Sequence, residues 1–325
     1  MATWFRMVRL LAMVVVAAAL LAPSAAPAQQ RRLVTIASGW VVGVYYPLAG
    51  AMSRIVDKAK GLDIRAVVES TGASVANARL IGDGEADFAL LQNDIAFYAY
   101  NGSTLPAFQG KRVKNMGGVF TIYPETIHVV ATRASGVKQV SQLRGKRVVL
   151  GPQGSGTEAN ALQILEAYGL APGDVKAQNI EAAAAAEELK AGRVDAAFFT
   201  TGLGSVVIVD TFDSGKAVLV PVDGAEARSL TSKFPFYTSV KVPRNLYRGQ
   251  GEVSAVAVMA MLVARADLPE DLVYRFTRAI FEDLKQFHEG HPAARNLTLD
   301  SALHGMPIAL HPGAERFYRE RGIRR

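Results

Sequence analysis

The sequence contains no cysteine, which excludes disulfide-bonded scaffolds, cysteine-ligated zinc, iron–sulfur clusters and thiol nucleophiles. Charged residues are also sparse: they make up 20% of the 325 residues, while 50% are hydrophobic. A chain of this composition buries a large core, so wholesale disorder is excluded as well. The length fits two ordinary domains or one large one.

A basic stripe of the kind that binds nucleic acid is missing too. The formal net charge is +7, but two of the positive charges, Arg6 and Arg9, lie close to the N-terminus. Others gather near the C-terminus, where Glu315 and Glu320 alternate with arginines in a pattern typical of a solvated terminal helix. We therefore expect no nucleic-acid partner.

The first apolar run is too short to span a membrane. Residues 10–22 are 13 apolar residues, whereas a spanning helix needs roughly 20. Two arginines precede this run and Ala26-Pro27-Ala28 follows it, which is typical of a cleavable secretory signal over residues 1–28; an uncleaved anchor is the alternative. The mature chain is thus expected in the periplasm and not across the membrane.

The chain repeats one plan about 115 residues apart. Residues 33–37 read as a strand, and the glycine-rich loop 38–43 leads from it into a helix with a proline in its first turn. Residues 147–150 read as a strand in the same way, and the glycine-rich loop 151–157 leads into a helix over residues 158–168.

A second pair of segments repeats as well. Gly84 and Asp87 stand between a predicted helix end and a buried strand, and Gly192 and Asp195 keep the same spacing. We expect each glycine to end its helix in the left-handed conformation and each aspartate to mark the turn into a parallel strand. Two such units in series predict an α/β fold with two lobes, a mainly parallel sheet in each, and a ligand cleft between them.

Extended segments are expected to connect the lobes. Residues 116–130 and 234–242 both look extended and bracket the second repeat unit, so the chain would cross there and form a hinge. Residues 253–264 are predicted to be a buried central strand. The predicted boundaries are residues 31–122 and 238–325 for lobe 1 and residues 123–237 for lobe 2.

Both glycine-rich loops end at helix N-termini, where unpaired backbone N–H groups and the helix dipole favour an anionic group. Ser155, Gly156 and Thr157 are the candidate ligand contacts in the second loop. Ser155 and Glu158 also have the spacing of a capping box, in which the serine hydroxyl serves its own helix. The two interpretations are compatible if Thr157 and the N–H groups contact the ligand.

Further candidates follow from their position at the same sheet edge. Gln92 comes directly after a buried strand, and Asp94 beside it can cap the next helix instead of binding a ligand. Of the adjacent Tyr45 and Tyr46, only one can face the core, so the other is expected at the cleft. The remaining candidates are Trp40 in the first loop and Thr200, Thr201 and Gly202 after the equivalent strand of lobe 2.

The sequence does not match common catalytic or metal-binding motifs. The loop 151–157 lacks the lysine of a phosphate-binding P-loop, and Gln153 stands where a nucleophile elbow needs glycine. His288 and His291 have no third ligand at a suitable spacing, so we interpret them as surface residues rather than metal ligands. A non-enzymatic binding protein without metal or cofactor is therefore expected.

Five motifs in order resemble those of the TAXI solute-binding proteins, the extracytoplasmic receptors of one branch of the TRAP (tripartite ATP-independent periplasmic) transporters. They are residues 38–47 with their Tyr-Tyr-Pro ending, 84–87 together with 92–94, 151–157, 264–269 and 311–314. The resemblance covers nearly the whole mature chain. It implies a type II periplasmic-binding-protein fold that closes on its ligand and delivers it to a membrane permease with a small and a large subunit, sometimes fused, that is driven by an ion gradient.

The resemblance also implies a ligand class and a set of contacts. The ligand would be a small anionic or zwitterionic solute, with glutamate, glutamine or a related dicarboxylate favoured. Two departures from the family pattern touch the predicted pocket: Trp40, Val41 and Val42 make the first loop bulkier, and residues 200–202 replace a smaller, more apolar run. The contacts carried over are Ser38, Gly39, Tyr45 or Tyr46, Gln92, Ser155, Gly156, Thr157 and the loop after Phe199.

Three other functions stay open at this point. A binding protein of an ATP-driven importer would have the same fold, and the motifs alone favour the TRAP reading. A small-molecule enzyme on this fold would need a nucleophile or an acid–base pair in the cleft. A receptor with a sensory partner is the third.

Overall fold

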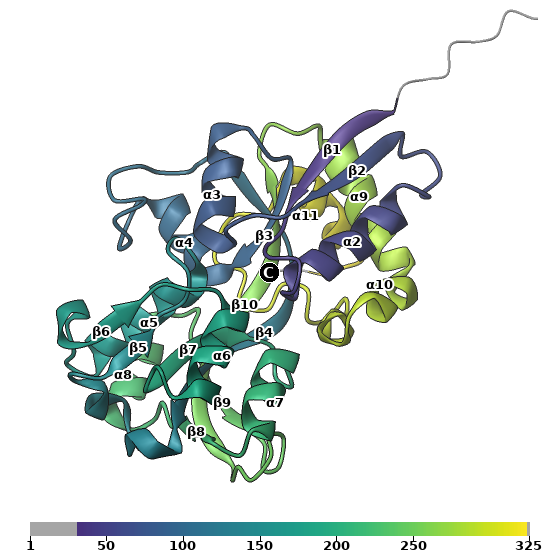
Figure 1. The fold of residues 1–325 in the computed structure, drawn as a ribbon. Coiled ribbons are helices and arrows are strands. Elements are labelled where there is room, and N and C mark those ends of the chain that lie inside the picture. Colours follow the sequence, from purple (N-terminus) through teal and green to yellow (C-terminus); the bar gives the residue numbers. More distant parts are fainter. Residues whose placement is uncertain (1–30, 324–325) are drawn as a thin grey trace, which may run out of the picture. The chain divides into compact units, whose positions relative to one another are not determined.

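The computed structural model describes residues 31–323 (Figure 1). The fold described below is that of the unit Leu33–Arg325. The predicted signal segment, residues 1–28, lies outside the described residues. Within residues 31–323, no helix combines the length and the apolar character needed to cross a membrane.

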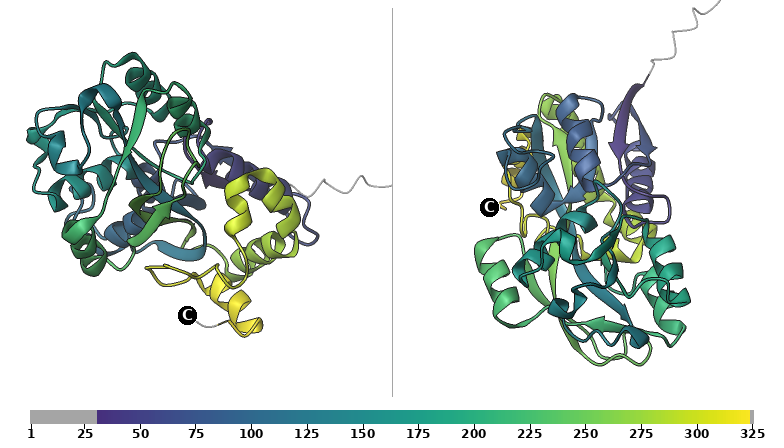
Figure 2. Two further views of the ribbon diagram at one scale, coloured as in Figure 1. Left: turned by 90° about the horizontal axis from the view of Figure 1, so that it is seen from below. Right: turned by 60° about the vertical axis from the view of Figure 1, so that its left-hand side comes forward.

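The unit is built on one ten-stranded sheet with helices on both faces (Figures 1 and 2). Eight strands follow one another in the order β2-β1-β3-β10-β4-β7-β5-β6, while β8 pairs with β4 and β9 pairs with β10. The strands are β1 (Arg32–Ala37), β2 (Ile64–Glu69), β3 (Phe88–Gln92), β4 (Met116–Thr132), β5 (Arg147–Val149), β6 (Lys176–Gln178), β7 (Ala196–Thr201), β8 (Ala217–Val220), β9 (Thr238–Val242) and β10 (Val253–Arg265).

The helices account for most of the connections between these strands. The bounds are α2 (Tyr45–Val56), α3 (Ser74–Asp83), α4 (Asn93–Asn101), α5 (Gly156–Ala167), α6 (Ala182–Ala191), α7 (Val206–Asp213), α8 (Gly224–Lys233), α9 (Glu270–Glu282), α10 (Leu284–Gly290) and α11 (Pro312–Glu320).

The sheet is mixed, whereas the sequence predicted a mainly parallel one. The β1–β3, β5–β6 and β5–β7 pairs are parallel, as the repeated units require. Strands β4 and β10 run antiparallel to their neighbours on both sides. Both are long strands in the middle of the sheet, and neither belongs to a repeat unit.

Strand β4 confirms the prediction that residues 116–130 are extended. It pairs with β10 from Met116 to Thr126 and with β7 from Thr126 to Ala131. Strand β10 pairs with β3 through residues 260–264 and with β9 through residues 253–257. We therefore propose that the chain crosses between the lobes for the second time along β10 rather than along residues 234–242. Lobe 2 would then extend to about residue 257.

The two faces of the sheet carry different cores. In β3, Ala89 and Leu91 join a cluster that also receives side chains from α3, α4, α5 and α8 and continues through β4, β5, β7, β8 and β10. Phe88 and Leu90 point to the opposite face and join a second cluster with α2, α9 and α11. A third cluster with α6 and α7 occupies the far end of that opposite face. One face thus has a continuous core, and the other has a core in two parts.

The second sequence repeat is confirmed in its local geometry. Gly84 and Gly192 end α3 and α6 in the left-handed conformation, with φ of 77° and 71°. Asp87 Oδ2 accepts a hydrogen bond from the backbone N–H of Thr35 (2.9 Å), and Asp195 Oδ2 accepts one from that of Arg147 (2.8 Å). Each aspartate therefore ties the turn after a helix to the neighbouring parallel strand.

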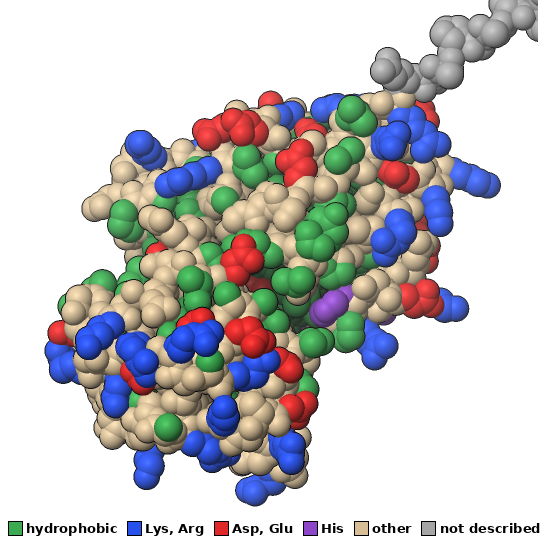
Figure 3. All heavy atoms as spheres, in the orientation of Figure 1, with side chains coloured by type: hydrophobic (Ala, Val, Ile, Leu, Met, Phe, Trp, Pro, Cys, Tyr) green, Lys and Arg blue, Asp and Glu red, His purple; other side chains and the backbone are tan. Residues whose placement is uncertain are grey.

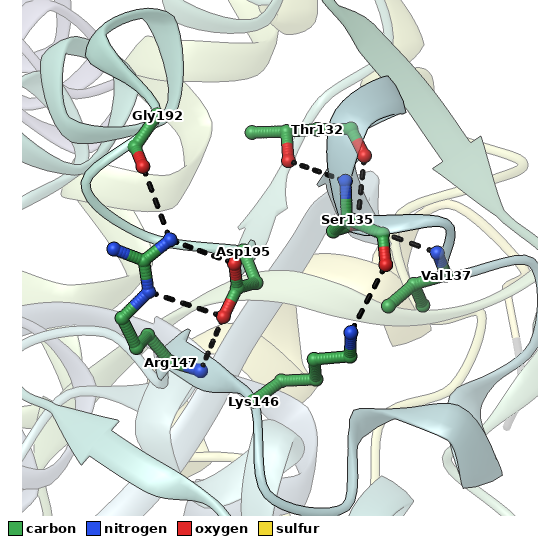
Figure 4. A network of polar contacts seen from close by, with 7 residues as sticks. All are labelled: Thr132, Ser135, Val137, Lys146, Arg147, Gly192 and Asp195. Atoms are coloured by element: carbon green, nitrogen blue, oxygen red, sulfur yellow. Dashed lines mark hydrogen bonds and ion pairs between the residues drawn. The ribbon is translucent and has the colours of Figure 1, made fainter.

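Asp195 has an additional charged partner (Figure 4). The Arg147 guanidinium donates to both carboxylate oxygens, at 3.2 Å and 2.8 Å, and also to the carbonyl of Gly192. These hydrogen bonds hold the pKa of the Asp195 carboxyl below its usual value. The carboxylate side chain is 18% exposed, so solvent screens this pair only in part.

Asp195→Asn is expected to lower the free energy of unfolding by about 1–3 kcal/mol at pH 7, since it weakens charge-assisted hydrogen bonds to β5. Urea denaturation measures the change. Asp210→Asn is the matched control: Asp210 pairs with Lys190, but its side chain is 59% exposed, so a change under about 0.5 kcal/mol is expected. Equal losses in the two variants would contradict the role given to Asp195.

Candidate ligand-binding site

A cavity of about 130 Å³ lies between the two parts of the divided core, on the face of the sheet that carries α2 and α6. It is lined by the loops after β1, β5 and β7, the ends of β3 and β7, the middle of β4, and the first residues of α2, α5 and α6. Figure 3 shows a hollow on this side, with hydrophobic side chains around it and acidic ones beside it. A volume of this size suits a small solute.

Most of the residues predicted from the sequence line this cavity. The loops after β1 and β5 belong to the two repeat units, and the topology places both at one opening because each follows a parallel strand. Ligand contact at these positions stays a prediction. The predicted residues found in the lining are Gly39, Trp40, Tyr45, Gln92, Ser155, Gly156, Thr157, Thr200 and Thr201.

Three predicted residues are not part of the lining. Ser38 is fully buried, and its hydroxyl donates to the carbonyl of Glu69 (2.6 Å), so it joins the loop to β2. Tyr46 is half-buried on α2, and its neighbour Tyr45 takes the position at the cavity instead. Gly202 lies beside the ring of Tyr123, just beyond the end of β7.

The N-terminus of α5 confirms the capping interpretation of Ser155. Its Oγ accepts from the backbone N–H of Glu158 (3.1 Å), while Glu158 Oε2 accepts from the N–H of Gly154 (2.7 Å) rather than from Ser155. The helix begins at Gly156, two residues earlier than predicted. Gly156 and Thr157 therefore form the first turn, where backbone N–H groups have no helical partner.

Gly156 is required by the close approach of Gln92. A Cβ atom at Gly156 would overlap the Gln92 carboxamide. Gln92 Nε2 donates to Asn160 Oδ1 (3.1 Å), but Gln92 Oε1 has no hydrogen-bond partner among residues 31–323 although the side chain is only 2% exposed. A buried acceptor without a partner is costly, so this atom marks a position for a donor on a ligand or water.

Asn160 on α5 is a polar hub that the sequence did not reveal. Its Nδ2 donates to Asp94 Oδ2 (2.6 Å) and to the Tyr237 hydroxyl (3.0 Å), and its Oδ1 also accepts from the Thr200 hydroxyl (3.0 Å). Asp94 is fully buried and further accepts from the N–H of Ile95, so it holds α4 against α5 instead of lining the cavity. Burial raises the pKa of Asp94 to about 7.

Glu125 is the main functional candidate that sequence reasoning missed. It lines the cavity from β4 and is 4% exposed. The Tyr45 hydroxyl donates to Oε2 and the Tyr123 hydroxyl to Oε1, both at 2.8 Å. Burial raises the pKa of Glu125 to about 7, although the two hydroxyls act in the opposite direction. The available signal was a lone acid inside the extended apolar run of residues 116–130.

The charges around the cavity do not match the expected anionic solute. Of the described residues that line it, Glu125 and Glu181 are charged, and none is lysine, arginine or histidine. Glu181 is exposed at the start of α6. A dicarboxylate would therefore meet no cationic side chain here, and its attraction would come only from backbone N–H groups and hydroxyls.

The sequence also shows the family to which the chain belongs. Residues 36–322 match the model of the NMT1-like family. The chain belongs to the NMT1-like family. The TAXI resemblance is a finer assignment than this match.

Solved structures with the same fold share little sequence with this member of the family. An ancestral arginine-binding protein bound to arginine is 14% identical, with a TM-score of 0.50 over 82% of this chain and 99% of that chain. A binding protein component of an ABC phosphonate transporter from Pseudomonas aeruginosa is 11% identical, with a TM-score of 0.52 over 81% and 79%. A protein from Xanthomonas citri bound to chloride ion is 11% identical, with a TM-score of 0.53 over 89% and 99%.

These likenesses establish the predicted architecture, the type II periplasmic-binding-protein fold. The arginine-binding protein and the phosphonate-transporter component are themselves binding proteins.

The contribution of the two buried acids to stability is expected to fall as the pH rises from 5 to 8 in the ligand-free protein, while His128, whose pKa burial lowers to about 4, acts in the opposite direction up to about pH 6.5. The folded state raises the pKa of both Glu125 and Asp94 to about 7, so it holds protons that the unfolded chain releases near pH 4. This stabilisation is complete below pH 4 and is lost as the pH passes 7. Glu125→Gln removes its own share, at most about 3 kcal/mol, so stability measured by urea denaturation should fall less, or rise more, between pH 5 and 8 than in the unaltered protein.

Glu85→Gln is the control for this pH dependence, because Glu85 is an exposed carboxylate away from the cavity. Its slope with pH should equal that of the unaltered protein. A slope in Glu125→Gln that also equals the unaltered one would show that Glu125 titrates normally.

Gly156→Ala is expected to lower the free energy of unfolding by about 1–3 kcal/mol, because the added methyl group displaces Gln92 from Asn160. Gly50→Ala is the matched control, since Gly50 is another helical glycine and its Cβ would meet only the flexible end of Arg54. That control should raise stability by about 0.5–1 kcal/mol through helix propensity. Thermal and urea unfolding compare the two, and changes of the same sign would argue against the contact.

Proposed function

We propose that the protein is a periplasmic solute-binding receptor that holds a small solute in this cavity and delivers it to a membrane permease. The observation that carries the proposal is the position of the cavity. It interrupts the core on one face of the sheet and is lined by the equivalent loops of both repeat units. A solute bound there touches both lobes, so it favours the closed arrangement over the open one.

The partner that we favour is the permease of an ATP-driven importer. Its support is the NMT1-like family match together with a neighbour named as part of an ABC phosphonate transporter, and this support is an analogy at the level of the fold. A TRAP permease is the second candidate, supported by the five TAXI-like motifs. Uptake of the bound solute into membrane vesicles separates them: the first requires internal ATP, whereas the second requires an ion gradient and is abolished by an ionophore.

Solute binding is testable with Trp40, which lines the cavity and is the sole tryptophan of residues 29–325. A panel of amino acids, amines, carboxylates, sulfonates and phosphonates is titrated while fluorescence and melting temperature are recorded. At least one solute is expected to give a saturable fluorescence change and a higher melting temperature, because ligand binding stabilises the folded state. A flat response in both measurements over the whole panel would contradict the receptor function.

Gln92→Ala should weaken binding of that solute by about tenfold or more, because a buried polar contact is lost. Gln109→Ala is the control, since Gln109 is exposed and away from the cavity. Unchanged affinity in both variants would place the solute elsewhere.

A further inference from the structure

Glu125 still has capacity to bind a ligand. A carboxylate can accept about four hydrogen bonds. The Tyr45 hydroxyl donates to one oxygen of Glu125 and the Tyr123 hydroxyl to the other, and the Gln92 side chain is a further hydrogen-bond donor to the carboxylate. At least one acceptor position is therefore left for a donor inside the cavity that Glu125 lines.

Among the described residues that line the cavity, none offers Glu125 a counter-charge. Tyr45 on α2, Tyr123 on β4 and Gln92 at the end of β3 are neutral, and the acid Asp94 on α4 acts on Glu125 to raise its pKa further. A buried carboxylate without a cation is unfavourable, and a neighbouring acid makes it more so. A cation supplied by the ligand would relieve both effects.

Aromatic rings complete an environment that suits a cation. Trp40, Tyr45, Tyr123 and Phe199 all line the cavity. The negative face of an aromatic ring attracts an ammonium group, and this attraction is greatest where water is excluded. The orphan Gln92 Oε1 is a further acceptor that an ammonium N–H can satisfy.

We propose that Glu125 determines the specificity of the cavity by pairing, as a carboxylate, with the protonated amine of a small organic solute. The inference rests on the proposed receptor function and names the class of solute for that same site. A single carboxylate elsewhere on the solute is compatible with it, since the first turn of α5 offers free N–H groups. A dicarboxylate that lacks an amine is disfavoured.

The opposite arrangement makes a different prediction. If Glu125 were protonated and donated to a carboxylate of the solute, Glu125→Gln would keep a donor of the same shape and preserve affinity. If Glu125 pairs with an ammonium group, the same substitution removes the counter-charge. The two arrangements also differ in pH dependence, because only the ammonium pair requires Glu125 to ionise.

The test uses the full mature chain and isothermal titration calorimetry with three four-carbon probes, added to the panel of solutes above. They are 1,4-diaminobutane, 4-aminobutyrate and succinate, which carry two, one and no amines at the same length. Solutes with an amine, among these probes or the panel, are expected to bind more tightly than matched carboxylates. For such a solute, Glu125→Gln should weaken binding by about 30-fold or more, as loss of one partner of a buried charge pair does.

Two variants serve as controls for the loss of charge. Glu181→Gln removes the other acid of the lining, which is exposed, so a smaller loss than that of Glu125→Gln is expected. Glu85→Gln removes an exposed acid away from the cavity and should leave affinity unchanged. Melting temperatures of all three variants show whether each one is folded.

A measurement on the unaltered protein makes the test independent of any variant. Between pH 6 and 8 an aliphatic amine stays protonated while Glu125 changes state. Affinity should therefore rise with pH over this range, and binding at pH 6 should release about one proton. The proton appears as a dependence of the binding enthalpy on the ionisation enthalpy of the buffer.

The outcomes separate the two proposals. Tighter binding of amines, loss of affinity in Glu125→Gln and proton release at pH 6 would support the inference. If the solutes that bind lack an amine, or if amines bind equally well to Glu125→Gln without proton release, the inference is overturned while the receptor function stands. If no solute binds the unaltered protein, the receptor function fails and the inference fails with it.

Discussion

Strand β4 is the element on which both the fold and the site depend. It pairs with β10 along one half and with β7 and β8 along the other, so a single continuous backbone supports both parts of the sheet. Ile127 and Val129 enter the continuous core, whereas Tyr123 and Glu125 face the cavity. The strand that joins the two lobes therefore also carries the central acid of the site.

The two faces of the sheet carry different cores, and this difference determines where the cavity lies. On one face, α3, α4, α5 and α8 share one core, and the hydrogen bonds of Asn160 fix α4 to α5 within it. On the other face the core is divided, and the interruption holds the cavity.

The buried acid of the cavity departs from the rules that stabilise a fold. A carboxylate that is 4% exposed costs folding free energy unless it is protonated or paired. The two tyrosine hydroxyls compensate only partly, since burial still raises the pKa of Glu125. Under the proposed function, a cationic ligand would remove the remaining cost, and that compensation would be a source of affinity.

The sequence by itself determined the repeat units, the left-handed glycines 84 and 192, the extended segment 116–130 and the loops that meet at the cavity, because these follow from local periodicity and turn chemistry. The antiparallel passages, the hub at Asn160 and the position of Glu125 were decided only by the tertiary structure. Glu125 and Tyr45 are 80 residues apart, and no local pattern reports which distant side chains will surround a polar residue. The charge of the cavity is such a property, since it is the sum over loops that only the folded sheet brings together.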